Sequence, residues 1–232
     1  MRNNFKIKLK NYRKILKLIN KYNFTKFDLI TNYGLLSGDT NLFKTLTIFE
    51  LIKRTKNVQG DIIEFGIWKG NTSFLIKKIL EIYKINKKLF LFDHFKGLQH
   101  FEKKDGKKSK RLKGAYLGNK KKIEDFIKFF KFKNIHLIDK DATTLNKDYF
   151  KGKKYSLAII DVDLYEPTLK ILNSIKNNVA KNGLIIFDEG NSKLVPGEGI
   201  ALKEFYKKNK KNFKIEKIKF SRQPDLILKK IK

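Results

Sequence analysis

Short apolar runs alternate with stretches of helical periodicity through most of this chain. Seven runs have the length and composition of buried strands, and they lie at residues 61–65, 88–93, 135–138, 156–161, 183–189, 213–220 and 225–228. The segments between the first five runs repeat apolar residues every three to four positions, which predicts helices. Strands separated by helices favour a parallel sheet that is covered on both faces. The pattern therefore predicts an α/β fold.

The pattern also indicates how the chain divides. Residues 1–31 place apolar side chains among lysines at helical spacing, and a break at 32–39 separates them from a helix through 43–52. We therefore expect residues 1–40 to form a helical accessory or oligomerising segment. Residues 41–232 are expected to form one domain, because a chain of 232 residues has room for little more.

One connection inside the domain is unusually long. Residues 99–117 are polar and rich in lysine and glycine. Long connections in compact domains tend to be lids or disordered segments. We interpret 99–117 as a mobile, lid-like flap near the site; a surface insertion without a function is the alternative.

Composition excludes some classes of protein. An apolar fraction of 41% with 20 phenylalanines indicates a folded chain. No run approaches the roughly 20 apolar residues of a membrane span. The N-terminus has no signal-peptide core, and the chain has no cysteine for disulfides or thiolate metal sites. The absent signal favours the cytoplasm.

The net charge of +31 raises the question of nucleic-acid binding. The lysines, however, are spread along the whole chain and greatly outnumber the arginines, and asparagine, isoleucine and phenylalanine are abundant. This profile is typical of a chain encoded by an AT-rich genome. We therefore expect weak, salt-dependent attraction to polyanions and no specific nucleic-acid partner.

The stretch 60–74, GDIIEFGIWKGNTSF, combines a strand, a glycine turn and the start of a helix. Gly66 and Gly70 lie in the turn, where glycine allows a tight bend and close approach of a ligand. The free N–H groups of the helix start suit a carboxylate or phosphate. One of three polar residues is expected to cap this helix: Asn71, Thr72 or Ser73. The dinucleotide fingerprint G-x-G-x-x-G is absent.

The pattern E-F-G-x-x-x-G resembles motif I of class I S-adenosylmethionine-dependent methyltransferases. The resemblance implies that Glu64 lies near the amino-acid end of the cofactor and that the Gly66–Gly70 loop wraps it. The cofactor-binding residues expected from this stretch are Glu64, Phe65, Gly66, Gly70, Asn71, Thr72 and Ser73. A glycine turn in another kind of α/β protein is the alternative.

Two further strand ends carry acidic residues suited to the same cofactor. Asp93 ends the second predicted strand, where a carboxylate commonly holds both ribose hydroxyls of a nucleotide-like cofactor. Asp141 and Ala142 follow the third predicted strand. Many relatives approach the adenine ring there, so the resemblance implies a cofactor contact at these two residues.

Later motifs narrow the resemblance to the macrocin O-methyltransferase family. The motifs are E-F-G-I-W-K-G, F-D-H-F-K-G-L, I-D-V-D-L-Y-E-P-T, and F-D-E-G followed by P-G-E, in this order between about Tyr33 and Tyr206. Members methylate sugar hydroxyls with S-adenosylmethionine and a divalent metal. The resemblance implies a Rossmann-like, seven-stranded, mostly parallel sheet with helices on both faces and extra N-terminal helices. His94 replaces a frequent serine and Gly190 a frequent aromatic residue, which leaves the small-molecule or glycan acceptor open.

Acidic residues also follow the fourth and fifth predicted strands. Parallel neighbours lie about 4.8 Å apart, so Asp161 is expected near Asp188 and Glu189. Packed carboxylates are unfavourable unless they share a proton or bind a cation. Oxygen ligands suit Mg²⁺, and we expect these three residues to hold Mg²⁺ or Mn²⁺. Asp161 or Asp163 is expected to take the acceptor's proton, with His94 as an alternative; solvated strand-end acids are the structural alternative.

Other functions fit parts of the pattern. The acceptor could be another hydroxylated small molecule, such as a catechol-like aromatic, and cephalosporin-hydroxylase-like proteins are an oxidative branch of similar sequence. A base methyltransferase is disfavoured, because the [DN]-P-P-[YFW] signature is absent and the chain reads D-L-Y-E-P-T instead. A non-catalytic scaffold would not need the intact acidic residues. The sequence does not identify the acceptor. It also leaves the oligomeric state open, and a homo-oligomer is one possibility.

Overall fold

The structure is a computed structural model, which describes residues 16–17, 19–31, 39–219, 221 and 223–232. Most of the predicted accessory segment 1–40 lies outside the described residues. The oligomerising role of that segment stays a prediction.

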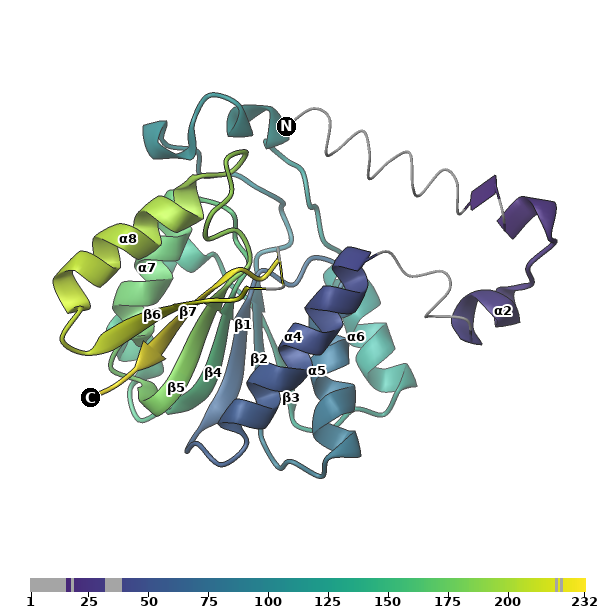
Figure 1. Cartoon of the computed structure of the whole chain (residues 1–232), viewed down its shortest axis with the longest axis horizontal. Coiled ribbons are helices and arrows are strands. Elements are labelled where there is room, and N and C mark those ends of the chain that lie inside the picture. Colours follow the sequence, from purple (N-terminus) through teal and green to yellow (C-terminus); the bar gives the residue numbers. More distant parts are fainter. Residues whose placement is uncertain (1–15, 18, 32–38, 220, 222) are drawn as a thin grey trace.

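A seven-stranded sheet forms the centre of the domain (Figure 1). Its strands are β1 (Asp61–Phe65), β2 (Leu89–Asp93), β3 (Ile135–Asp139), β4 (Tyr155–Ile160), β5 (Val179–Phe187), β6 (Phe213–Lys217) and β7 (Leu226–Lys230). The strand order is β3-β2-β1-β4-β5-β7-β6. The first five strands are parallel, and β7 runs antiparallel to both β5 and β6. The predicted fold class is confirmed.

Helices cover both faces of the sheet. The helices α4 (Asp39–Thr55), α5 (Asn71–Ile82) and α6 (Lys120–Phe129) lie on one side, and α7 (Tyr165–Ile175) and α8 (Gly197–Asn209) lie on the other (Figure 1). Four short 3₁₀ helices complete the domain: η1 (Lys103–Asp105), η2 (Ser109–Leu112), η3 (Ala142–Thr144) and η4 (Lys147–Phe150). No helix of the described chain has the length and apolar character needed to span a membrane.

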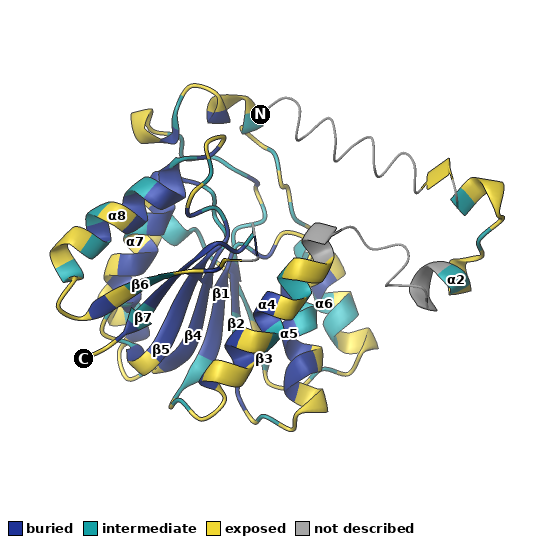
Figure 2. Cartoon of the chain, in the orientation of Figure 1, coloured by how far each residue is buried: buried dark blue, intermediate teal, exposed yellow. Residues whose placement is uncertain are grey.

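Alternation along the strands explains why both faces are apolar. Successive side chains of a strand point to opposite faces. In β1, Ile63 and Phe65 therefore join the core under α7 and α8, whereas Ile62 joins the core under α4 and α5. The central strands are buried along their length (Figure 2). The resulting rigid layer fixes the positions of the strand ends.

The predicted strand boundaries were most in error at the start of β5 and the end of β6. β5 begins at Val179 rather than at residue 183, because the buried Val179 and Ala180 precede two exposed residues that hid the strand. Asn182 there has φ 65°, and the β4–β5 register shifts at this point. β6 ends at Lys217, three residues before the predicted end at 220.

The helical spacing expected over residues 1–31 corresponds, where the chain is described, to two separate helical pieces. Residues 19–21 are helical, a turn follows at 22–23, and α2 (Lys26–Thr31) begins a new helix. Thr25 and Asp28 start it with reciprocal hydrogen bonds: the Asp28 N–H donates to Thr25 Oγ1 at 3.1 Å and the Thr25 N–H donates to Asp28 Oδ2 at 2.8 Å. Such an exchange satisfies donors that a helix N-terminus leaves free.

The lysine-rich segment 99–117 is attached to the domain by a buried aspartate. Asp105 is fully buried, and its carboxylate accepts the N–H groups of Glu102 and Tyr165, each at 2.7 Å. The second of these bonds ties the segment to the first residue of α7. Gly197 provides the space, since a Cβ there would lie 1.9 Å from Asp105 Oδ1. Segment 99–117 is thus docked at the edge that carries the strand ends.

Candidate active site

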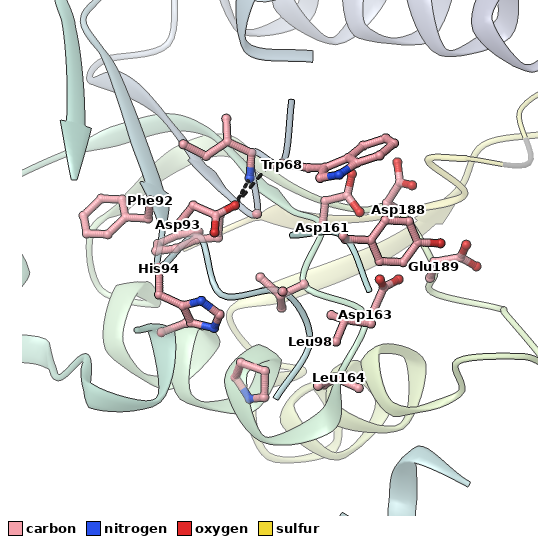
Figure 3. A pocket seen from close by; sticks show the side chains of 18 of the residues that line it. Trp68, Phe92, Asp93, His94, Leu98, Asp161, Asp163, Leu164, Asp188 and Glu189 are labelled. Carbon is pink, nitrogen blue, oxygen red and sulfur yellow. Dashed lines mark hydrogen bonds between the residues drawn. The ribbon is translucent and has the colours of Figure 1, made fainter. Parts of the chain in front are cut away.

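A cavity of about 320 Å³ opens beyond the carboxyl ends of the parallel strands (Figure 3). Ligands in open parallel sheets bind at this edge. The structure brings most of the predicted site residues to its wall: Phe65, Gly66, Asn71, Thr72, Asp93, Asp141, Ala142, Asp161, Asp163, Asp188 and Glu189. Three others, Glu64, Gly70 and Ser73, are not among the lining residues.

Gly66 is required where β1 enters the turn. It has φ 85°, and a Cβ at this position would lie 1.9 Å from the carbonyl oxygen of Asp161. Any other residue would therefore separate β1 from β4 at the cavity. Gly70, with φ 79°, occupies the N-cap of α5. The expected side-chain cap from Asn71, Thr72 or Ser73 was wrong, because α5 begins at Asn71 and has no side-chain cap.

Ser73 instead serves Glu64. Its Oγ donates to Glu64 Oε2 at 2.6 Å, and both residues are buried. Burial raises the pKa of Glu64 to about 8, against the opposing effect of the Ser73 hydrogen bond. Glu64 is thus a buried residue outside the cavity wall. Its raised pKa favours the protonated carboxyl at neutral pH.

Asp93 fastens the glycine loop to the end of β2. Its Oδ2 accepts the N–H groups of Ile67 at 2.8 Å and Trp68 at 3.0 Å, and its Oδ1 accepts the N–H of Phe95 at 2.7 Å (Figure 3). A carboxylate has about four acceptor positions, so capacity for a further donor remains. Asp93 lines the cavity, and its contact with ribose stays a prediction.

Asp141 is held by neighbours on two segments. Its Oδ1 accepts the N–H of Thr143 at 2.9 Å and so caps η3, and its Oδ2 lies 2.7 Å from His100 Nε2. Although partial burial works the other way, the hydrogen bonds from Thr143 and His100 lower the pKa of Asp141. His100 comes from segment 99–117 and was not found from the sequence.

The carboxylates at the ends of β4 and β5 face a lysine. Lys44 Nζ on α4 lies 3.3 Å from Asp161 Oδ2 and 2.9 Å from Asp188 Oδ1. Although burial disfavours its ammonium form, Asp161 and Asp188 raise the pKa of Lys44. Burial and the neighbouring Asp188 raise the pKa of Asp161 to about 6, while Lys44 opposes the rise. Lys44 was not predicted from the sequence.

The remaining acids of this group have different partners. Burial and the Asp161 carboxylate raise the pKa of Asp163 well above its usual value. Gln223 Nε2 donates to Glu189 Oε1. The Glu189 N–H donates at 2.8 Å to Oε1 of Glu198, which is fully buried. The other oxygen of Glu198 has no hydrogen-bond partner within the described chain, and burial raises the pKa of this carboxyl.

The acids suit a cation in the type of donor that they offer. No three histidine, aspartate or glutamate side chains of the described residues are arranged to hold a metal ion together. Two of the three expected ligands, Asp161 and Asp188, do converge on one cation, the Lys44 ammonium. Glu189 follows Asp188 directly in the chain. The oxygen set therefore fits a hard divalent ion, on condition that Lys44 and Gln223 give up their contacts.

An aromatic pair stands beside the acids. Trp68 and Tyr116 meet edge to face, with ring centroids 5.5 Å apart, and both line the cavity. Burial and the nearby Asp163 raise the pKa of Tyr116. Tyr116 belongs to segment 99–117 and lines the cavity; the lid-like role of this segment stays a prediction. Neither ring was singled out by the sequence reasoning.

His94 lines the same cavity from the loop after β2. Its Nδ1 accepts the N–H of Lys96 at 3.0 Å. This bond leaves one ring nitrogen for a ligand, and it gives His94 a structural role in the loop.

Comparison with known proteins agrees with this geometry. The sequence model of the macrocin-O-methyltransferase (TylF) family matches residues 36–221. Demethyldecarbamoylnovobiocin O-methyltransferase from Streptomyces niveus is 27% identical over 143 residues, which are 57% of this chain and 53% of the relative. The chain thus spans about half the length of the curated relative that it matches.

Solved structures share the fold. The crystal structure of CalS11, calicheamicin methyltransferase, has a TM-score of 0.81 at 20% identity, covering 95% of this chain and 91% of that one. The structure of the O-methyltransferase NovP has a TM-score of 0.69 at 16% identity, covering 82% of this chain and 81% of that one. At these identities the likeness is one of architecture.

Proposed function

This chain belongs to the macrocin-O-methyltransferase family, and we propose that it transfers a methyl group from S-adenosylmethionine to a hydroxyl of a sugar. The observation that carries the proposal is the group of acids at the ends of β4 and β5, which faces the cavity beside the glycine loop. The relatives support it: a second CalS11 structure is described as a TDP-rhamnose 3'-O-methyltransferase. The acceptor sugar here is expected to be part of a polysaccharide, glycolipid or nucleotide-sugar precursor.

The cofactor is assigned to the β1–β3 side of the cavity. S-adenosylmethionine, when bound, supplies a methyl group on a positively charged sulfur. Gly66 lines the cavity, and Asp93 holds the loop and offers an acceptor for the ribose hydroxyls. Asp141 and Ala142 line the place assigned to the adenine ring. Glu64 does not line the cavity; its carboxyl group accepts the hydrogen bond of the Ser73 hydroxyl, on the first turn of α5.

The acceptor is assigned to the β4–β5 side. A sugar hydroxyl must lose its proton, and a positioned base contributes about 100-fold to 10,000-fold to such a step. We assign this role to Asp163, because it lines the cavity whereas Asp161 is held by Lys44. Trp68 and Tyr116 offer apolar surface for the face of a sugar ring next to these acids.

We include a divalent ion, expected to be Mg²⁺, in the proposal. Asp161, Asp188 and Glu189 would hold it with carboxylate oxygens. Such an ion, when bound, lowers the pKa of a coordinated hydroxyl and orients it. The convergence of Asp161 and Asp188 on an ammonium supports this assignment.

A transfer assay tests the proposal directly. The purified protein would be incubated with methyl-labelled S-adenosylmethionine and a panel of nucleoside-diphosphate sugars and catechols, with Mg²⁺ or with EDTA. We expect label on a sugar hydroxyl, and loss of transfer in EDTA. Transfer to catechols alone would replace the sugar by an aromatic acceptor. Transfer that is unchanged in EDTA would remove the metal from the proposal.

A further inference from the structure

Lys44 reaches the active site from outside the strand-end motifs. It lies on α4, 117 residues before Asp161, and its side chain is 20% exposed at the cavity wall. The other described lysine that lines the cavity, Lys140, lies over the Tyr149 ring, 4.8 Å from its centroid, at the end of β3. Lys44 is thus the lining lysine that contacts the paired carboxylates.

The position of the ammonium conflicts with a metal ion. Lys44 Nζ lies 2.9 Å from Asp188 Oδ1 and 3.3 Å from Asp161 Oδ2. Mg²⁺ binds carboxylate oxygens at about 2.0–2.1 Å. An ion that shares these two oxygens would stand close to Nζ and repel it. The ammonium and the divalent ion cannot occupy this place together.

We propose that Lys44 is a built-in competitor of the divalent ion, which neutralises Asp161 and Asp188 in the metal-free protein and is displaced when the ion binds. This inference rests on the metal assignment in the proposed function. It explains how the two carboxylates can lie together in a folded, metal-free chain, because a paired charge avoids the repulsion of bare acids. Metal affinity then depends on a residue of α4, because two cations that compete for one place each weaken the binding of the other.

Metal binding to two variants tests the inference. Mn²⁺ affinity would be measured by electron paramagnetic resonance of the free ion, for wild type, Lys44→Met and Lys44→Arg. We expect Lys44→Met to bind Mn²⁺ at least about tenfold more tightly, within the range of ordinary coupling between sites. Lys44→Arg keeps the charge and should stay close to wild type. Lys140→Met removes a charge from the same cavity without touching the acids and measures the general electrostatic effect.

A second measurement uses the wild-type protein, because Lys44→Met leaves Asp161 and Asp188 without their partner and so destabilises the fold. Acetylation of the Lys44 amine would be followed by peptide mass mapping. We expect slow labelling without metal and faster labelling at saturating Mn²⁺, as the amine is released. Labelling that is unchanged or slower with Mn²⁺ would overturn the proposal.

The outcomes separate this inference from the proposed function. Equal or weaker Mn²⁺ binding by Lys44→Met would overturn the competitor role and leave methyl transfer intact. Failure of every variant to bind Mn²⁺ would overturn it together with the metal assignment. Calorimetric binding of S-adenosylhomocysteine, measured in EDTA, would then report whether the cofactor assignment still holds.

Discussion

The carboxylates on the two sides of the cavity are held in opposite ways. At the end of β2, Asp93 accepts hydrogen bonds from three backbone N–H groups, and the buried Glu64 of β1, which does not line the cavity, accepts one from the Ser73 hydroxyl. At the ends of β4 and β5, Asp161 and Asp188 share the charged Lys44. Figure 3 shows the two groups apart, with Asp93 on one side and the four acids from β4 and β5 on the other.

The difference indicates which side of the cavity is arranged before a ligand binds. Hydrogen bonds from backbone groups already arrange the side that we propose for the cofactor, and such preorganisation reduces the ordering that binding requires. The acceptor side instead keeps like charges together, a condition that a bound cation relieves. Substitutions among the acids after β4 and β5 should therefore lower turnover, whereas substitutions at Asp93 should weaken cofactor binding.

The largest effect is expected from Asp163→Asn. Asp163 has φ 61°, a conformation that asparagine tolerates well, so the variant should fold. Loss of the base should lower the turnover number about 100-fold to 10,000-fold. Calorimetry with S-adenosylhomocysteine should show nearly unchanged affinity. A parallel loss of affinity would contradict the separation between the two sides.

Asp93→Ala should act on the other side. Without the carboxylate, the Ile67 and Trp68 N–H groups lose their acceptor, and cofactor affinity should fall by about 1–3 kcal/mol. Asp139→Ala is a matched control, because Asp139 stands opposite Asp93 in the β2–β3 register and pairs with Lys120 at the surface. Equal losses in the two variants, measured by calorimetry, would show that the loop contacts are irrelevant.

Glu64→Gln should change the pH dependence of stability. The pKa of Glu64 is raised from 4.5 to about 8 in the fold, so the folded chain binds the extra proton. Its contribution to the free energy of unfolding is full below about pH 4.5 and is lost as the pH rises to about 8. The glutamine variant should lose this decline in urea titrations between these pH values. Identical slopes for both proteins would contradict the raised pKa.

The smallest effect is expected from Asp141→Asn. The amide oxygen can still cap η3, and the partly exposed pair with His100 is weakened. Exposed ion pairs contribute about 0.2–1 kcal/mol, and cofactor affinity should change by no more than that. A double-mutant cycle with His100→Asn measures the pair. A loss as large as that of Asp93→Ala would give Asp141 a greater role.

The acids could be predicted from the sequence because strand ends are a local signal. An apolar run followed by aspartate marks where a strand meets the ligand edge, as at Asp93 and Asp161, and the topology then assembles the site. Lys44 has no such mark. It is one of many lysines in the chain and lies on a helix whose periodicity indicates only which face is buried. The acid that it contacts, Asp161, is 117 residues away.

Competition between partners explains the local errors. Ser73 was a reasonable helix cap by residue type, but the buried Glu64 takes its hydroxyl, and Gly70 supplies the turn without a side chain. His100 and Tyr116 belong to segment 99–117, where no periodicity indicates which side chains face the cavity. Such contacts depend on packing between distant segments, which a single sequence does not encode locally.

The attachment of segment 99–117 through Asp105 has a consequence for redesign of this protein. The segment that carries Gln99, His100 and Tyr116 into the cavity is bound to the first residue of α7, under Gly197. Four lysines beyond this point, by contrast, are exposed: Lys107, Lys108, Lys110 and Lys113. Replacement of segment 99–117 by the corresponding segment of a relative should therefore succeed when both Asp105 and Gly197 are kept. Such exchanges would change the residues that face the proposed acceptor, while the sheet and the Gly66–Gly70 loop stay the same.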